Sequence, residues 1–174
     1  MIIYKDLISG DEIISDVYKV TDVGSGLWEY DGKMVKKGAE NFVLEGANPS
    51  AEGEDADEGG AEGGVEQVID FVDDFRYNKI DGLDKKAYMG DVKRYMKALT
   101  KKMEEVGKSK DEVKEFQTGA QEGIKKIIAN FKDYDVYKGE SLDDDSMYIL
   151  VNFREDGVTP FATIWKHGLK EEKV

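Results

Sequence analysis

The chain has no cysteine among its 174 residues and only one histidine. Without cysteine there can be no disulfide, no thiolate metal site and no cysteine nucleophile. A single histidine, His167, also excludes a metal site built from several imidazoles. His167 stands beside Gly168 near the end of the chain, and we interpret it as a surface or half-packed side chain rather than a catalytic base.

Long apolar runs and catalytic motifs are also missing. No stretch approaches the roughly 20 apolar residues that would span a bilayer, and residues 1–6 lack the basic start and apolar stretch of a signal peptide. There is no GxxxxGK[ST] phosphate loop and no nucleophile elbow. We therefore expect a cytoplasmic protein that has no membrane span and is not an enzyme.

Positive charge is missing from one segment. The net charge of the chain is -13, and the stretch from Gly38 to Phe75 has twelve acidic residues but no lysine or arginine. Outside this stretch the acidic and basic residues are therefore almost equal in number. Its middle, from Gly46 to Gly64, has too few large apolar side chains to offset the entropy of ordering it. We predict an acidic mobile loop over residues 38–66 within a single domain, residues 1–174. The acidity argues against nucleic-acid binding.

The first third of the chain has the pattern of short strands. Met1–Tyr4, Val17–Val20 and Leu27–Tyr30 are β-prone segments separated by turn residues. Asp31-Gly32 is a typical hairpin signal, and Val65–Phe75 contains enough apolar residues for a further strand.

Residues 81–130 predict two helices. Apolar residues recur there at steps of three and four, which gives each helix one apolar face. Asp81 or Asp84 can cap the first helix, Gly107 ends it, and Ser109 begins a capping box for the second. The short connection predicts an antiparallel helical hairpin.

The last third returns to strand patterning. Tyr134–Tyr137, Met147–Phe153 and Phe161–Trp165 are β-prone, with a turn before the last. Strands, a helical hairpin and strands again predict an α+β fold of mixed, mainly antiparallel β-sheets.

Two acidic clusters could attract calcium. Asp55, Asp57 and Glu66 occupy places 1, 3 and 12 of an EF-hand loop, but place 5 is Gly59 and no amphipathic helices flank the segment. Partial matches of this kind arise from composition, so we expect no tightly bound cofactor and only weak calcium association. Residues 143–145, three consecutive aspartates, are open to the same reading or to that of a solvated turn.

The first predicted helix has a basic face. At about 100° per residue, five cationic side chains gather opposite the apolar stripe: Lys86, Lys93, Arg94, Lys97 and Lys101. This face is either a solvated helix surface or a docking surface for an acidic partner, including the acidic segment of the chain itself.

Several sequence blocks resemble the translationally controlled tumour protein family. They are Met1–Glu12, Asn48–Gly53, Ile128–Lys132, Gly139-Glu140 and Arg154–Pro160, in order and at family spacing along almost the entire chain. The resemblance implies a tent-like arrangement of β-sheets from which the helical hairpin projects.

The resemblance also implies a multifunctional protein of growth and survival signalling. Family roles include calcium binding, tubulin or microtubule binding, contact with a Ras-like small GTPase, contact with apoptosis regulators, and secretion without a signal peptide. The residue that the family assigns to GTPase contact matches Glu12. The alternatives are guanine-nucleotide exchange on that GTPase, and a calcium-buffering or general scaffold protein.

The chain departs from the family at two points. Many members carry cysteines, one of which can join two chains, whereas this sequence has none, so we expect no cysteine-linked dimer. Lys138 stands where members more often have an apolar residue.

Overall fold

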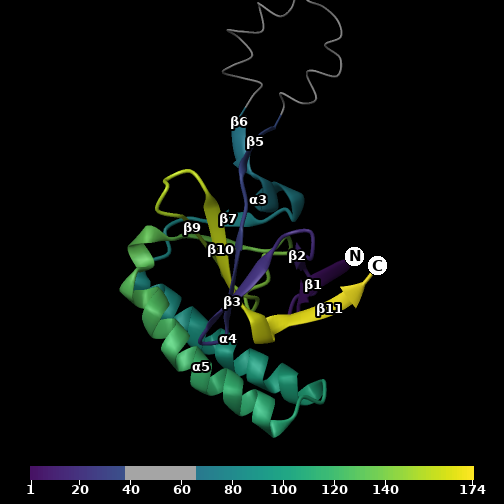
Figure 1. The fold of residues 1–174 in the computed structure, drawn as a ribbon. Coiled ribbons are helices and arrows are strands. Elements are labelled where there is room, and N and C mark those ends of the chain that lie inside the picture. Colours follow the sequence, from purple (N-terminus) through teal and green to yellow (C-terminus); the bar gives the residue numbers. More distant parts are fainter. Residues whose placement is uncertain (38–65) are drawn as a thin grey trace, which may run out of the picture.

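Three antiparallel sheets form the body of the protein in the computed structural model, which describes residues 1–37 and 66–174 (Figure 1). One sheet has three strands in the order β11 (Leu169–Lys173), β1 (Ile2–Asp6) and β2 (Glu12–Ser15). The second has six, in the order β3 (Val20–Gly24), β4 (Leu27–Asp31), β10 (Pro160–Trp165), β9 (Ile149–Phe153), β8 (Asp135–Lys138) and β7 (Asn78–Ile80). The third pairs β5 (Met34–Lys37) with β6 (Glu66–Ile69).

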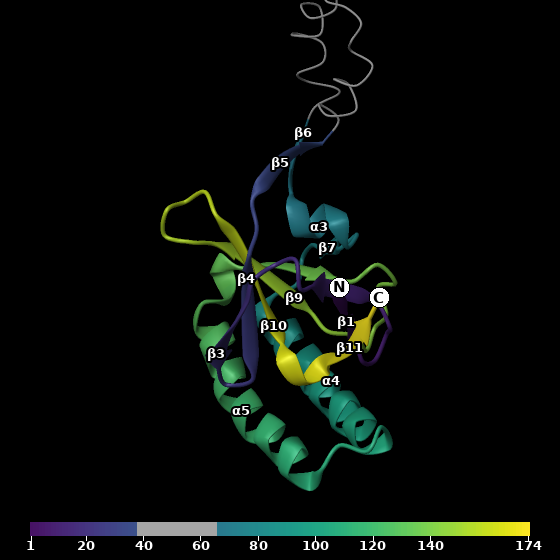
Figure 2. The same ribbon diagram turned by 45° about the vertical axis from the view of Figure 1, so that its right-hand side comes forward.

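Two long helices project from the sheets as an antiparallel hairpin. They are α4 (Lys85–Glu105) and α5 (Lys110–Ala129), and both views place them at the end of the molecule away from the β5–β6 pair (Figures 1 and 2). A short helix, α3 (Asp70–Asp74), and 3-10 turns at Phe131–Asp133 and Lys166–Gly168 complete the described residues. The α+β class and the helical hairpin predicted from the sequence are confirmed.

The hairpin begins and ends at the residues that its local chemistry favours. Asp84, not Asp81, caps α4: its carboxylate accepts a hydrogen bond from the backbone N–H three residues on, at 2.7 Å. Ser109 caps α5 in the same way at 3.1 Å. Gly107, between the helices, has a φ of 86°, a conformation that costs glycine little and other residues more.

The apolar stripes of both helices are buried as predicted, with a few exceptions. Tyr88, Val92, Tyr95, Leu99 and Met103 of α4 are all buried. In α5 the buried members are Val113, Phe116, Ala120 and Ile127. Met96, Ile124 and Ile128 are only partly buried, and Val106 is exposed at the end of α4.

The strand expected at Val17–Val20 is wrong, because most of that segment forms a turn between β2 and β3. The Tyr18 side chain accounts for this. Its hydroxyl donates to Asp74 at 2.7 Å, and its ring packs edge-on against Phe71 with the centroids 6.2 Å apart. These tertiary contacts outweigh the β propensity of the segment.

The expectation of a strand over Val65–Phe75 is only partly confirmed. Its described part forms β6 up to Ile69 and then turns into α3. The Asp70 carboxylate accepts hydrogen bonds from the backbone N–H groups of Lys33 and Phe71, at 3.1 and 2.8 Å, and Phe71 is fully buried beside it. Glu66, expected as the last residue of the acidic loop, is the first residue of β6; the rest of that loop lies outside the described residues.

The Asp31-Gly32 pair does not make the hairpin that its sequence signals. β4 pairs with β3 and β10, whereas β5 pairs with β6, so the chain leaves the six-stranded sheet at this point. A Cβ at Gly32 would lie 2.6 Å from the ring of Phe71. Glycine is therefore required here for close packing rather than for a tight turn.

The sequence did not reveal β11, which is rich in charge. β11 pairs with β1 in register from Ile2 and Lys173 to Asp6 and Leu169, so the two termini lie side by side (Figure 1). Its last four residues are all exposed and charged, which fits an edge strand, where charged side chains discourage pairing with another chain.

The hairpin contacts the sheets most closely at a glycine surface of α5. A Cβ at Gly123 would lie 2.9 Å from the Ser25 carbonyl oxygen and 2.9 Å from the indole of Trp165. A Cβ at Gly119 would lie 3.2 Å from the Ser25 backbone. The turn between β3 and β4 therefore packs directly on the backbone of α5, and this contact orients the hairpin on the six-stranded sheet.

Alanine substitutions at two helical glycines should have opposite effects. Gly123→Ala is expected to lower the free energy of unfolding by up to about 2 kcal/mol, because overpacking costs roughly 1–3 kcal/mol and the gain in helix propensity is only about 1 kcal/mol. Gly90→Ala is expected to raise it by about 1 kcal/mol, since nothing lies within 4 Å of a Cβ there. Urea unfolding of both variants measures this, and equal signs would contradict the assigned packing.

Candidate functional site

The five cationic residues of the basic face are all exposed on α4. They are Lys86, Lys93, Arg94, Lys97 and Lys101. The four lysines form no ion pair or side-chain hydrogen bond with another described residue. No side chain of residues 1–37 and 66–174 pairs with these four charges, so they are available to solvent or to a partner.

Arg94 differs from the four lysines because it is tied to the turn of three aspartates. Its guanidinium lies 3.3 Å from the Asp145 carboxylate and 3.6 Å from that of Asp91, and it donates to the Asp144 carbonyl oxygen at 3.1 Å. Arg94 thus joins α4 to the β8–β9 connection. The Arg94 side chain is still 54% exposed, but its charge is shared with this turn, whereas the four lysines have no ion-pair partner among the described residues.

The buried side chain of Lys138 holds the same turn. Its ammonium donates to the carbonyl oxygens of Asp143 and Asp144 at 2.7 and 3.1 Å and lies 4.8 Å from the ring centroid of Tyr148. Burial lowers the pKa of Lys138, against the opposing pull of Asp144. Residues 143–145 therefore form a turn that Arg94 and Lys138 hold together. The sequence indicated this role only indirectly, through a lysine at position 138, where family members more often have an apolar residue.

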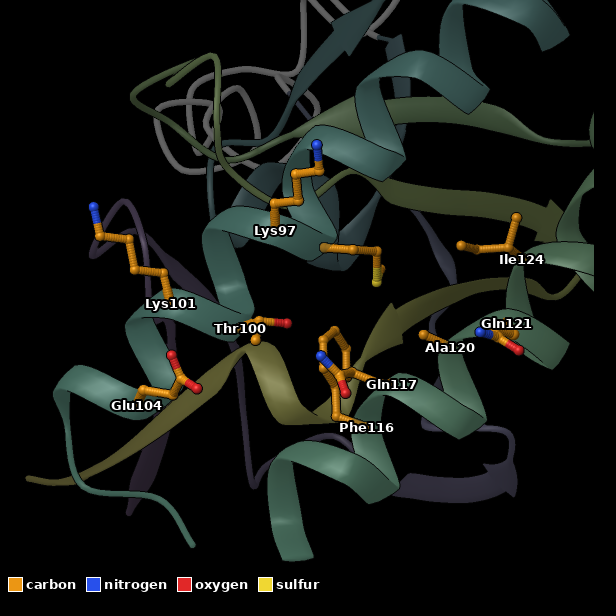
Figure 3. Close-up of a pocket in the computed structure, with 10 residues that line it drawn as sticks. Lys97, Thr100, Lys101, Glu104, Phe116, Gln117, Ala120, Gln121 and Ile124 are labelled. Carbon is orange, nitrogen blue, oxygen red and sulfur yellow. The ribbon is translucent and has the colours of Figure 1, made fainter. Parts of the chain in front are cut away.

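A groove of about 550 Å³ runs between α4 and α5, next to the basic face (Figure 3). Met96, Phe116, Ala120 and Ile124 supply its apolar lining. Its walls are polar, with Lys97, Thr100, Lys101 and Glu104 from α4 and Gln117 and Gln121 from α5. The sequence placed the lysines on one helix face but gave no sign of the groove, because the spacing of the two helices depends on how they pack.

Glu12 is exposed at the start of β2, on the edge of the three-stranded sheet. It lies opposite Lys5 in the strand register and raises the pKa of that lysine, although the larger cause is the hydrogen bond from Lys5 to Glu172. The Lys5–Glu172 ion pair measures 2.5 Å, whereas Glu12 itself forms no ion pair with another described residue.

A hollow of about 170 Å³ surrounds Glu12, with charged groups of both signs. Asp11 lines it but is engaged, since its carboxylate accepts from the Ser141 hydroxyl at 2.7 Å and from the Ser141 N–H. Arg76 and Glu140 also line it and form an exposed ion pair of 3.4 Å. Glu12 is thus the acidic group of this hollow without a fixed internal role.

The calcium candidates are not brought together by the described structure. Asp55 and Asp57 lie outside the described residues, and Glu66 lies in β6 opposite Lys37. Within residues 1–37 and 66–174, no three acidic or histidine side chains are grouped so that they could hold a metal ion.

His167 is packed more tightly than a surface histidine. Its side chain is 11% exposed, its ring centroid lies 5.5 Å from that of Phe116, and Nε2 lies 4.0 Å from the Glu115 carboxylate. Nδ1 is buried without a hydrogen-bond partner among the described residues. Burial lowers the pKa of His167, and this outweighs the opposing effect of Glu115.

The sequence and fold can now be compared with those of known proteins. A family profile described as "Translationally controlled tumour protein" matches residues 1–170. This chain belongs to that family. The homologue of Aspergillus oryzae is 54% identical and that of Saccharomyces cerevisiae is 46% identical, each over the full length of both chains.

Solved structures of family members have the same fold. The translationally controlled tumour-associated protein p23fyp of Schizosaccharomyces pombe aligns with a TM-score of 0.79 at 46% identity, over 100% of both chains. The family member from Caenorhabditis elegans, solved by NMR, aligns with a TM-score of 0.68 at 27% identity, over 100% of this chain and 99% of its own. The family resemblance seen in the sequence blocks is confirmed. No helix in the described part of the chain has the length and apolarity to cross a bilayer.

The lowered pKa of His167 gives a testable pH dependence. The unfolded chain takes up this proton near pH 6.5, the ordinary value, whereas the folded protein does so only at lower pH. Stability from the neutral imidazole is therefore complete above pH 6.5 and is lost as pH falls through the folded pKa.

We expect the parent protein to lose stability relative to a His167→Gln variant as pH falls from 7.5 to 5, as measured by urea unfolding. Glu115→Gln is the control: it removes a carboxylate that raises this pKa, so the loss should be steeper. If the free energy of unfolding changed with pH in the same way for the parent protein and for His167→Gln, burial would not lower the pKa of this histidine.

Proposed function

We propose that this chain is a non-catalytic, cytoplasmic binding protein that supports growth and survival signalling by contacting a Ras-like small GTPase through the surface around Glu12. Family membership supports the class of function. The observation that carries the assignment is the exposed Glu12 carboxylate, which has no ion pair with another described residue and borders a hollow with Arg76.

The surface around Glu12 suits recognition of a charged partner. Glu12 stands on a strand that continues into the buried residues Ile13 and Ile14, so its backbone is firmly held. Because the strand is already ordered, only the Glu12 side chain, and not its backbone, has to be immobilised when it pairs with a cation of a partner. Arg76 also lines the hollow; its side chain is 72% exposed, and its exposed pair with Glu140 could be exchanged for a partner's carboxylate. Together the two charges would favour one orientation of the partner.

Removing the charge of Glu12 tests this proposal. If Glu12 forms a desolvated ion pair, Glu12→Gln should weaken binding of the purified GTPase by roughly 2–5 kcal/mol, measured by calorimetric titration. Glu155→Gln is the matched control, because Glu155 is also exposed but lies in the β9–β10 turn, and it should bind as the parent does. Equal affinities for both variants would remove Glu12 from the contact.

Guanine-nucleotide exchange is the alternative on the same surface. It requires that the bound chain accelerate nucleotide release, which the titration does not report. Release of a fluorescent nucleotide from the GTPase distinguishes the two: no acceleration at saturating chain leaves binding without exchange. A general scaffold with no preferred GTPase would show neither binding nor acceleration.

The basic face supports a second function, association with tubulin or microtubules. Four exposed lysines on one helix, without ion pairs to other described residues, would be attracted to a polymer of acidic subunits. Arg94 adds little to this attraction because the aspartate turn already neutralises it. The contact would be electrostatic and would weaken as salt is added.

Microtubule pelleting tests this with two variants of equal charge. Replacing Lys86, Lys93, Lys97 and Lys101 with glutamine should abolish most co-sedimentation and its salt dependence. The control replaces four other exposed lysines with glutamine: Lys79, Lys110, Lys132 and Lys170. An equal loss in both variants would mean that net charge, not the basic face, governs the association.

The remaining family roles have less support from the described residues. Weak calcium association stays a proposal, because Asp55 and Asp57 lie outside those residues and Glu66 is in β6. Contact with apoptosis regulators and secretion without a signal peptide are likewise proposed from the family alone.

A further inference from the structure

The groove between α4 and α5 has an apolar base and polar walls. Its apolar lining consists of Phe116 and Ala120, which are 1% and 3% exposed, and of the partly buried Met96 and Ile124. Figure 3 shows Phe116, Ala120 and Ile124 on the α5 side. Phe116 and Ala120 are already covered, so the apolar surface that a further apolar group could remove from water belongs mainly to Met96 and Ile124. No described segment of the chain lies over it.

One wall of the groove carries a row of like charges. Lys93, Lys97 and Lys101 follow one another at four-residue steps along α4, and Lys97 and Lys101 line the groove directly. Like charges at this spacing destabilise a helix by about 0.2–0.5 kcal/mol for each pair. No described acidic side chain forms an ion pair with any of the three, so folding alone gives no reason for the row.

The opposite wall has a different character. Gln117 and Gln121 of α5 are exposed and neutral, with amide groups that can both donate and accept hydrogen bonds. The groove is therefore apolar at its floor, cationic on the α4 side and neutral on the α5 side. Only Glu104, near the end of the hairpin, contributes negative charge.

We propose that this groove binds an amphipathic helix of a partner protein, with its apolar face on Met96, Phe116 and Ile124 and with acidic residues along one side that meet Lys93, Lys97 and Lys101. The lining runs from residue 96 to residue 104 of α4, which is about 12 Å of helix and matches roughly two turns of a docked helix. This proposal goes beyond the microtubule proposal, because the partner must present apolar side chains as well as acidic ones. A purely acidic surface would not be enough.

Charge favours an acidic partner helix over a second copy of the chain as the occupant of the groove. In a two-fold dimer the same patch faces itself, so each copy would bring its lysines to the interface and only Glu104 among the lining residues as an acidic group to meet them. A helix with glutamates beside its apolar stripe instead offers one acidic group for each lysine. Electrostatic complementarity therefore selects the partner helix, and the partly exposed side chains of Met96 and Ile124 add apolar contact.

The probe is a designed peptide of about 14 residues, with leucines at helical spacing and glutamates on one flank. Two controls match it: a scrambled peptide of the same composition and a polyglutamate of the same length. Calorimetry should show binding of the designed peptide that is at least tenfold tighter than that of either control. NMR of the full chain should place the largest shift changes at Met96, Thr100, Phe116 and Ile124.

Two variants separate the floor of the groove from its charge. Gln121→Trp places a ring over the groove from an exposed position, and Lys97→Glu with Lys101→Glu reverses the wall. Each should weaken binding of the designed peptide at least tenfold, while Lys110→Glu with Lys170→Glu, an equal charge change elsewhere, should have little effect. Gln121→Trp should still pellet with microtubules as the parent does, which separates this inference from the microtubule proposal.

Three results would overturn the proposal. The first is equal affinity of the scrambled and designed peptides, and the second is unchanged binding by Gln121→Trp. The third is a concentration-dependent dimer in sedimentation that Gln121→Trp dissolves, because the occupant would then be a second copy of the chain.

Discussion

The contact between the β3–β4 turn and the backbone of α5 helps to position the helical hairpin and the two surfaces on it, the basic face and the groove. At Gly123 the Ser25 carbonyl oxygen and the Trp165 indole come within reach of the helix backbone itself, and Gly119 allows the same approach one turn earlier. The lysines of α4 face outward because the apolar stripe of that helix is buried, and Arg94 adds a contact to the β8–β9 connection. The glycine contact of α5 holds the other helix of the hairpin on the sheet. Glycine is therefore the constraint on which the projecting hairpin depends.

Positive charge on and near α4 serves two different purposes. Arg94 and Lys138 hold the aspartate turn of residues 143–145 through carbonyl oxygens and carboxylates. The four lysines of the basic face have no such internal role with the described residues. Charge that stabilises the fold and charge that is open to partners thus lie side by side, and only the contacts distinguish them. The same distinction applies to acids: Asp11 is held by Ser141, whereas Glu12, its neighbour, is free of ion pairs with described residues.

Prediction from the sequence succeeded where a local signal and the tertiary structure agree. The helical stripes, the caps at Asp84 and Ser109, and the strand at residues 161–165 follow from periodicity and turn chemistry. It failed where a distant contact decided the outcome. Tyr18 bonds to Asp74, so its segment turns instead of extending. The lysines were placed on one face correctly, but the groove beside them needed the packing distance between two helices.

The sequence by itself determined the family, the α+β class, the helical hairpin and the position of the basic residues on it, because these depend on residue order and on the period of the helix. The tertiary structure decided which charges remain available, since an ion pair such as Arg94–Asp145 joins residues far apart in the chain. It also decided the burial of His167 against Phe116 and the shape of the groove. Burial and contact are properties of the packed chain, and no local pattern encodes them.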